Sequence, residues 1–159
     1  MNSGCMNSAG KRSGRYTGQR GVTLIELMIV IVVLSILTSI AVSNYRRYAL
    51  RANRTDGTMA LLRIQVAQER FFLQNNAYAQ TMTQVTAAPP NGLGITLGTG
   101  NVTTGGYYVI SFSGTPTATT YTIQATATGG QTADTSACLT LAIDQSGNRT
   151  PAASTGCWR

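Results

Sequence analysis

One acidic residue stands out because the sequence around it is entirely apolar or uncharged. In residues 22–42 the only ionisable side chain is Glu26. Glu26 lies four residues inside this stretch, and if the stretch is buried in lipid the carboxylate is costly, since a charged side chain at the centre of a span costs about 2.5 to 3.5 kcal/mol. Glu26 therefore either pairs with a cation or is protonated and has no partner. We expect the pair, because a charge in a low-dielectric setting needs a partner close by.

The three cysteines are the next residues with chemistry of their own. Cys138 and Cys157 lie near the C-terminus, whereas Cys5 lies in the basic N-terminal stretch. If that stretch is removed, an even pair remains, which suits one disulfide in an oxidising compartment and favours a periplasmic location. Closing this loop would stabilise the fold by roughly 3 kcal/mol. The alternative is two free, buried thiols.

The sequence offers little material for catalysis. It contains no histidine, and Asp134 and Asp144 have neither a nearby base nor the spacing of metal ligands. Serine and threonine are abundant, but without a general base they are most often surface residues of strands and loops. We therefore predict a protein that is not an enzyme and that uses no cofactor and no metal.

The segment that carries Glu26 can span a membrane. Hydrophobic residues make up 43% of the chain and charged residues only 11%, and the apolar ones are concentrated in residues 22–43. As a helix, this run covers about 31 Å, which matches the hydrocarbon thickness of a bilayer. The sequence therefore predicts one transmembrane helix.

The net charge of +7 has its origin around this span. Ten of the twelve basic residues precede it or follow it within one predicted helix, namely Lys11, Arg12, Arg15, Arg20, Arg46, Arg47, Arg51, Arg54, Arg63 and Arg70. The chain beyond residue 70 is formally neutral, so the charge does not by itself indicate nucleic-acid binding. Because bases lie on both sides of the span, the positive-inside rule leaves the orientation open.

Residues 44–75 are expected to continue the same helix, because they are rich in Arg, Ala, Leu and Gln and contain no proline. Apolar residues recur at helical spacing and predict a stripe that packs on a sheet. The stripe consists of Ala60, Ile64, Ala67 and Phe71. Residues 74–76 end this helix of roughly fifty residues, with the arginines of its second half mostly off the stripe.

The rest of the chain has the pattern of a small sheet. Residues 76–106 hold two consecutive prolines and many Gly and Thr residues, which predicts a connecting loop. In residues 107–159, strand patterns occur at 107–113, 121–128 and 138–144, and residues 145–148 form a turn before a short last segment. Short antiparallel strands that face an amphipathic helix predict an α+β domain.

Residues 1–21 show no hydrophobic period and are interpreted as a leader outside the fold. The string Gly21-Val22-Thr23-Leu24-Ile25-Glu26-Leu27 that follows resembles the prepilin processing site of the type IV pilin superfamily. The resemblance implies that a membrane peptidase cuts after Gly21 and methylates the new N-terminus at Val22. It also implies that Glu26 is the intramembrane glutamate of the family, which pairs with the new N-terminal ammonium of its own chain or of a neighbour.

The C-terminal half is similar, more loosely, to minor pilins of the PilE and ComP kind. This similarity rests on Tyr107-Tyr108-Val109-Ile110, Gln131-x-x-Asp134, Cys138-Leu139-Thr140-Leu141 and Cys157-Trp158. The implied fold is the type IV pilin fold, with one long N-terminal helix packed on a small antiparallel sheet and a C-terminal disulfide loop. The implied function is that of a structural, minor subunit of a type IV pilus.

The resemblance also implies partners and a location. The partners are other pilins, the prepilin peptidase and the inner-membrane assembly platform. The precursor would lie in the inner membrane with its C-terminal domain in the periplasm, and the mature subunit in a cell-surface pilus. Two alternatives are a DNA-uptake receptor among the minor pilins and a pseudopilin of a type II secretion system. We expect weak or no DNA affinity, because the distal domain has few bases and its aromatic residues are typical of a core.

Overall fold

The computed structural model describes residues 21–158. They belong to two compact units, which divide between Ser39 and Ile40. Cys5 and all of the expected leader except Gly21 lie outside the described residues. The first unit is the start of the long helix, and the second unit contains the rest of that helix and every strand.

Helix α1 (Leu24–Asn75) has 52 residues, so the expected single helix of about fifty residues is confirmed. It ends where the sequence predicted. Asn76 has a positive φ of 50°, a conformation that asparagine adopts more easily than most residues at a helix C-terminus. The side-chain amide of Asn75 donates a hydrogen bond of 3.0 Å to the carbonyl of Phe71, which satisfies one of the last free carbonyls.

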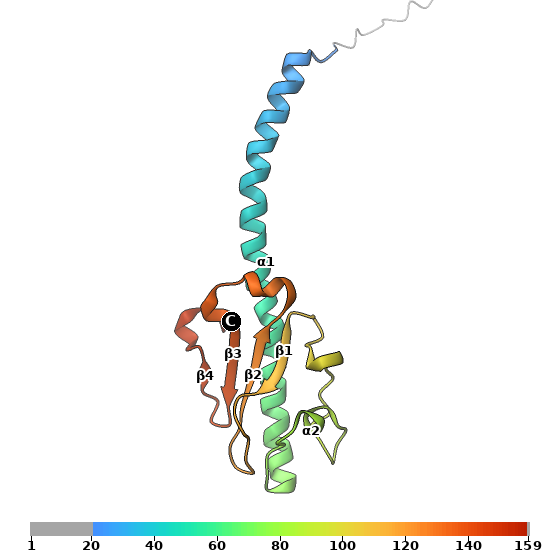
Figure 1. Ribbon diagram of the computed structural model, residues 1–159, viewed down its shortest axis with the longest axis vertical. Helices are drawn as coiled ribbons and strands as arrows, with labels where there is room; N and C mark the ends of the chain where they lie inside the picture. Colours follow the sequence, from blue (N-terminus) through green and yellow to red (C-terminus); the bar gives the residue numbers. More distant parts are fainter. Residues whose placement is uncertain (1–20, 159) are drawn as a thin grey trace, which may run out of the picture. The chain divides into compact units, whose positions relative to one another are not determined.

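A four-stranded antiparallel sheet packs on the second half of α1 (Figure 1). Its strands follow one another in the order of the chain and are β1 (Tyr108–Phe112), β2 (Thr122–Ala127), β3 (Thr140–Asp144) and β4 (Arg149–Thr150). In the register, Ile110 lies opposite Ala125, and Ala125 lies opposite Leu141. All three are fully buried, so one row across the sheet faces the helix.

The helix contributes the other half of the core. Ile64, Ala67 and Phe71 of the predicted stripe are buried, while Ala60 is half-buried at its edge. Gly57 is a special position, because a Cβ atom there would lie 3.0 Å from the ring of Tyr108. The missing side chain lets the first strand approach the helix closely. The α+β class, the small antiparallel sheet and its packing on the helix were therefore predicted correctly.

The third strand is shorter than the sequence suggested. It begins at Thr140 rather than at residue 138, because Ser136–Cys138 forms a turn of 3₁₀ helix. In that turn the N–H of Cys138 donates to the carbonyl of Thr135 at 2.8 Å. Cys138 therefore belongs to the turn and does not continue β3. Its sulfur is bonded to Cys157.

The connection between helix and sheet contains two short elements. Helix α2 (Met82–Thr86) begins with a capping box, in which Thr81 and Gln84 each bind the backbone of the other. A turn of 3₁₀ helix follows at Thr99–Asn101. The remainder of residues 76–106 is irregular, as expected for a connecting loop.

Candidate functional site

The start of α1 is set by two residues of the predicted processing motif. The N–H of Glu26 donates a hydrogen bond of 3.3 Å to Oγ1 of Thr23, and the N–H of Leu27 donates to the carbonyl of Thr23 at 3.2 Å. Thr-x-x-Glu is the sequence of a capping box, and a helix N-terminus attracts a negative charge in its first turn. Charge and spacing identified Glu26 from sequence, but its position in a capping pattern was missed.

The side chains around Glu26 form an apolar surface that the first unit does not cover. Exposure ranges from 47% at Val30 to 76% at Leu24 among the large apolar residues of this segment. The hydroxyls of Ser35 and Thr38 donate at 2.7 Å to carbonyls of the preceding turn, so they need no outside partner. The helix contains a stretch long and apolar enough to cross a membrane. Such a surface requires lipid or other apolar helices around it.

A buried ion pair joins α1 to the C-terminal half within the second unit. Arg54 donates through Nη2 to Oδ1 of Asp134 at 2.6 Å and through Nε to Oδ2 at 2.7 Å. The two side chains are 11% and 3% exposed. Burial alone would raise the pKa of Asp134, but hydrogen bonds from Arg54 and from the N–H of Thr135 hold that pKa below its usual value. This bidentate geometry is the strong form of the interaction.

Gln131 connects the same carboxylate to the core. Its side-chain amide donates to Oδ2 of Asp134 at 3.0 Å, to the carbonyl of Leu50 at 2.9 Å and to the hydroxyl of Tyr108 at 3.3 Å. Burial raises the pKa of Tyr108, which keeps its hydroxyl neutral. The Gln131-x-x-Asp134 motif therefore anchors the segment after β2 to the helix.

The C-terminal loop is closed by the disulfide between Cys138 and Cys157, both buried. Arg54 reaches this loop as well, because its Nη1 donates to the carbonyl of Gly156 at 3.3 Å. Trp158 covers the loop and donates from its indole nitrogen to the carbonyl of Thr150 at 3.3 Å. One arginine of the helix thus holds the chain at both ends of the disulfide loop.

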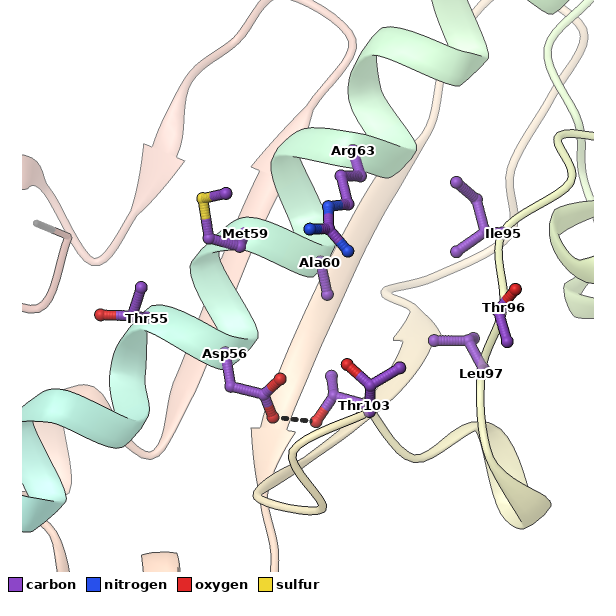
Figure 2. A pocket seen from close by; sticks show the side chains of 10 residues that line it. Thr55, Asp56, Met59, Ala60, Arg63, Ile95, Thr96, Leu97 and Thr103 are labelled. Carbon is purple, nitrogen blue, oxygen red and sulfur yellow. Dashed lines mark hydrogen bonds between the residues drawn. The ribbon is translucent and has the colours of Figure 1, made fainter.

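A second acidic residue fixes the connecting loop to the helix. Asp56 accepts a hydrogen bond from Oγ1 of Thr103 and another from the N–H of Gly105 at 3.1 Å. Asp56 and Thr103 border a pocket of 180 Å³ between α1 and the loop, where Arg63 of the helix and Ile95 of the loop also lie (Figure 2). Both carboxylate oxygens of Asp56 are used by the loop, so the arrangement positions the loop.

The remaining candidates for chemistry have structural roles. Within residues 21–158, no group of three or more His, Cys, Asp and Glu side chains could hold a metal ion. Arg54 lies against Asp134, a contact that the sequence did not indicate. A guanidinium stays protonated and cannot act as a general base. Asp144 accepts hydrogen bonds from Asn148 and Ser146, which hold its pKa low although burial acts in the opposite direction.

The candidate residues fall into two separate groups. Gly21, Val22 and Glu26 lie together at the start of the first unit, and the cysteine pair lies in the second. Sequence reasoning missed the functions of Arg54 and Asp56, since a helical arginine and aspartate look like solvated surface residues. Four aromatic residues of the C-terminal half were expected to lie in the core, and this is confirmed for three of them. Tyr108, Tyr121 and Trp158 are buried, and Tyr107 is 38% exposed.

Two family models match the chain. The model of the type IV minor pilin ComP, DNA uptake sequence receptor, matches residues 43–142. The model of the prokaryotic N-terminal methylation motif matches residues 16–42. Together they match residues 16–142, which include the processing motif.

Individual relatives match over shorter lengths. The type IV major pilin protein PilA of Myxococcus xanthus (strain DK1622) is 34% identical over 73 residues, which are 46% of this chain and 33% of PilA. The type II secretion system core protein G of Pectobacterium carotovorum subsp. carotovorum is 37% identical over 79 residues, or 49% of each chain. The chain thus spans a third to a half of the length of these curated relatives. A solved type IV pilin from Shewanella oneidensis is 26% identical, with a TM-score of 0.47, and covers 69% of this chain and 98% of its own.

Proposed function

We propose that this chain, which belongs to the family of the type IV minor pilin ComP, is a structural and minor subunit of a type IV pilus, processed by prepilin peptidase. The observation that carries the proposal is the exposed apolar surface of the first unit with one acid in its first helical turn. A filament core of packed helices would cover this surface. Burial at about 25 cal/mol per Å² then supplies cohesion, although the gain is smaller for helices that leave a lipid environment.

The proposed processing event creates the missing partner of Glu26. Cleavage after Gly21 exposes an ammonium at Val22, which the peptidase then methylates without removing its positive charge. The ammonium lies four residues from Glu26, so it can pair with its own carboxylate or with that of a neighbouring subunit. A subunit out of register would leave both charges unpaired in an apolar interior, which is strongly unfavourable. The pair would therefore set the axial position of each subunit.

The proposed location follows from the same features. The precursor crosses the inner membrane once, and the second unit lies in the periplasm, where the disulfide of Cys138 and Cys157 is stable. The mature subunit then becomes part of a cell-surface pilus. The partners are other pilins, the prepilin peptidase and the inner-membrane assembly platform. The exposed apolar surface of the first unit supports a role in assembly.

Mass spectrometry of membranes and of sheared surface filaments tests the proposal. The filament form should begin at Val22, carry one added methyl group and contain the oxidised cysteine pair. Glu26→Gln should be cleaved yet be depleted from filaments, because the amide cannot neutralise the ammonium. Thr38→Val is the matched control, since this similar-sized change in the same span removes only a hydroxyl that binds its own backbone. Retention of the leader in filaments, or normal incorporation of Glu26→Gln, would refute the proposal.

DNA uptake is a second candidate function, favoured by the description of the matched ComP model. In the second unit, five arginines are exposed on α1, namely Arg46, Arg47, Arg51, Arg63 and Arg70. Arg149 lies 5.3 Å from the ring centre of Trp158. Arg54 is already neutralised by Asp134. Among the described residues beyond α1, Arg149 is the single base, so we expect weak binding that disappears at physiological salt. A gel shift with the full chain in lipid nanodiscs measures this, and submicromolar binding at that salt concentration would reverse our preference.

A pseudopilin of a type II secretion system is the other alternative, because the matched core protein G belongs to such a system. Pseudopilins share the leader and the apolar helix, so these features do not separate the two functions. The disulfide between Cys138 and Cys157 favours the pilus. The mass spectrometry of sheared filaments also decides this question, because only a pilus subunit is recovered with surface filaments of normal length.

A further inference from the structure

The part of α1 with which the second unit begins has the composition of a membrane–water interface. Val42 is the last aliphatic residue of the predicted span and is 52% exposed. Tyr45 and Tyr48 follow it, and each is 73% exposed. Tyrosine is enriched where a helix passes from hydrocarbon to water, because its ring is apolar and its hydroxyl is polar. In a chain that spans a membrane, these two rings would lie at the level of the lipid headgroups.

The same short segment carries positive charge. Arg46, Arg47 and Arg51 are exposed and lie four to nine residues beyond Val42. Four residues of helix correspond to about 6 Å, which is about the thickness of the headgroup layer on one side of a bilayer. Arg47 donates a hydrogen bond of 3.3 Å to Oδ1 of Asn44. Within residues 21–158 Arg46 forms no salt bridge, so its guanidinium can bind an external anion.

A pocket of 250 Å³ opens beside Arg46. One wall is α1, which contributes Ala49 and Asn53, and the other wall includes Tyr107 of the sheet side and Gln131 of the segment after β2. No carboxylate of the described residues lines this pocket. An occupant should therefore carry a negative charge for the arginine.

The pocket wall also contains a buried acceptor without a partner. Gln131 is 1% exposed, and its Oε1 accepts no hydrogen bond within the described residues. The orientation of the amide is fixed, because Nε2 donates to the carbonyl of Leu50 and to the carboxylate of Asp134, which can only accept. A polar contact of this side chain with an occupant must therefore involve Oε1. A buried acceptor without a hydrogen bond is unfavourable, so the occupant should also bring a donor.

These two requirements select among the lipids of a membrane surface. Phosphatidylcholine has neither a net charge nor a donor in its headgroup. Phosphatidylethanolamine has a donor, but its ammonium would lie among Arg46, Arg47 and Arg51, which repel it. A headgroup made of a phosphate and a polyol has both the negative charge and the donor. Its hydroxyls project from the phosphate toward water, and Gln131 lies in that direction, because it binds the carbonyl of Leu50 one helical turn beyond Arg46.

We propose that this pocket binds the headgroup of an anionic phospholipid of the phosphatidylglycerol class. Arg46 binds the phosphate, and a headgroup hydroxyl donates to Oε1 of Gln131, directly or through one water. The bound lipid holds the second unit at the membrane surface before assembly. This inference rests on the proposed membrane location, but it depends neither on cleavage nor on assembly.

The test uses the full chain in nanodiscs that contain equal amounts of four lipids. These are phosphatidylglycerol, phosphatidylmethanol, phosphatidylethanolamine and phosphatidylcholine, so that net charge and hydrogen-bond donor vary independently. Phosphatidylmethanol has the charge of phosphatidylglycerol but no hydroxyl. Native mass spectrometry then counts the lipids that stay on the chain after its release into mild detergent. We expect phosphatidylglycerol to be retained at least about fivefold more often than each of the others.

Variants assign the retained lipid to the pocket. Arg46→Gln should lower the retention of phosphatidylglycerol by about fivefold. Arg47→Gln is the matched control, because it removes the same charge from an exposed residue outside the pocket. Ala49→Leu should also lower retention, because it fills the pocket without changing its charge, and Ala52→Leu on the exposed face is its control. Unchanged fluorescence of Trp158 confirms that each variant is folded.

Several outcomes would overturn the proposal. Equal retention of the four lipids, or an equal loss with Arg47→Gln, would mean that general attraction of charges replaces a site. Phosphatidylmethanol or phosphatidylethanolamine retained as often as phosphatidylglycerol would exclude the proposed headgroup class. Soluble glycerophosphoglycerol that displaced the lipid at equal concentration would make the pocket a site for a free phosphodiester. A DNA duplex that displaced the lipid, and that bound less well to Arg46→Gln, would make it a DNA contact.

Failure of this proposal and failure of the proposed function are distinguishable. A chain that does not enter nanodiscs contradicts the membrane location and with it both proposals. A chain that enters them without a headgroup preference contradicts the lipid site alone. Mass spectrometry of sheared filaments tests cleavage and assembly independently of any bound lipid.

Discussion

Replacing Arg54 with methionine should destabilise the second unit by about 3 kcal/mol, because it leaves the nearly buried carboxylate of Asp134 without its cation. Methionine keeps most of the apolar stem, so the change is mainly electrostatic. Gln131 and the N–H of Thr135 still donate to the carboxylate, which places the loss at the lower end of the range for broken buried pairs. For a unit of this size the melting temperature should fall by about 10 °C.

The pH dependence identifies the cause. In the wild type the pKa of folded Asp134 is lowered, so its contribution to stability is present above the unfolded pKa of about 3.9 and is lost as pH falls through the folded pKa. Without Arg54, burial dominates and the folded pKa rises relative to the wild type. The difference in unfolding free energy between Arg54→Met and the wild type should therefore be largest near neutral pH and shrink in acid.

Urea denaturation of the full chain in nanodiscs, followed by fluorescence, measures this difference. Trp158 is the only tryptophan of the chain and is buried in the C-terminal loop that Arg54 holds. Arg54→Met combined with Asp134→Leu is the control, because removing both charges should restore much of the stability. A loss below about 0.5 kcal/mol, as for an exposed pair, would refute the reasoning. So would a loss that is the same at pH 3 and pH 7.

Three further substitutions probe the packing of the second unit by the same denaturation assay. Gly57→Ala should cost about 1 kcal/mol, because overpacking against the buried ring of Tyr108 outweighs the gain in helix propensity, and equal or greater stability would contradict this. Gln68→Leu should cost about 2 to 4 kcal/mol by leaving the N–H and carbonyl of Ala79 without partners, whereas a neutral effect would mean that water replaces the amide. Cys138→Ser should cost about 3 kcal/mol, since the disulfide closes a loop across a separation of 19 residues, and reductant should then have no further effect.

Much of the fold could be predicted because its determinants are local or periodic. No proline interrupts the chain up to Asn75, so the long helix could be predicted. The apolar stripe that contains Ile64 predicts which face of the helix is buried. Alternation in the strands gives their number and approximate places. The start of β3 could not be predicted, because residues 138 and 139 have a strand-like composition. The direction of the chain there depends on a turn and on a disulfide with a distant residue.

The candidate site residues likewise divide into those that a local sequence motif reveals and those that only the folded structure brings together. Gly21, Val22 and Glu26 are adjacent in sequence, so a motif reveals them, and their roles in cleavage and assembly stay predictions. The pair of Arg54 and Asp134 joins residues 80 positions apart. Neither residue has a local pattern that separates it from a solvated surface charge, so only the packed structure shows the contact.

The two units satisfy their surfaces in opposite ways, and this difference suits the proposed use of one chain both in a membrane and in a filament. In the second unit, Asp56, Asp134 and Asp144 all accept hydrogen bonds from within the unit. That unit can therefore keep its structure while its surroundings change. The described residues of the first unit, 21–39, form no core, and their apolar side chains need lipid or other helices around them. Transfer from lipid to a bundle would exchange one apolar environment for another, so the proposed pairing of Glu26 with an N-terminal ammonium is the interaction that would distinguish the correct register from all others.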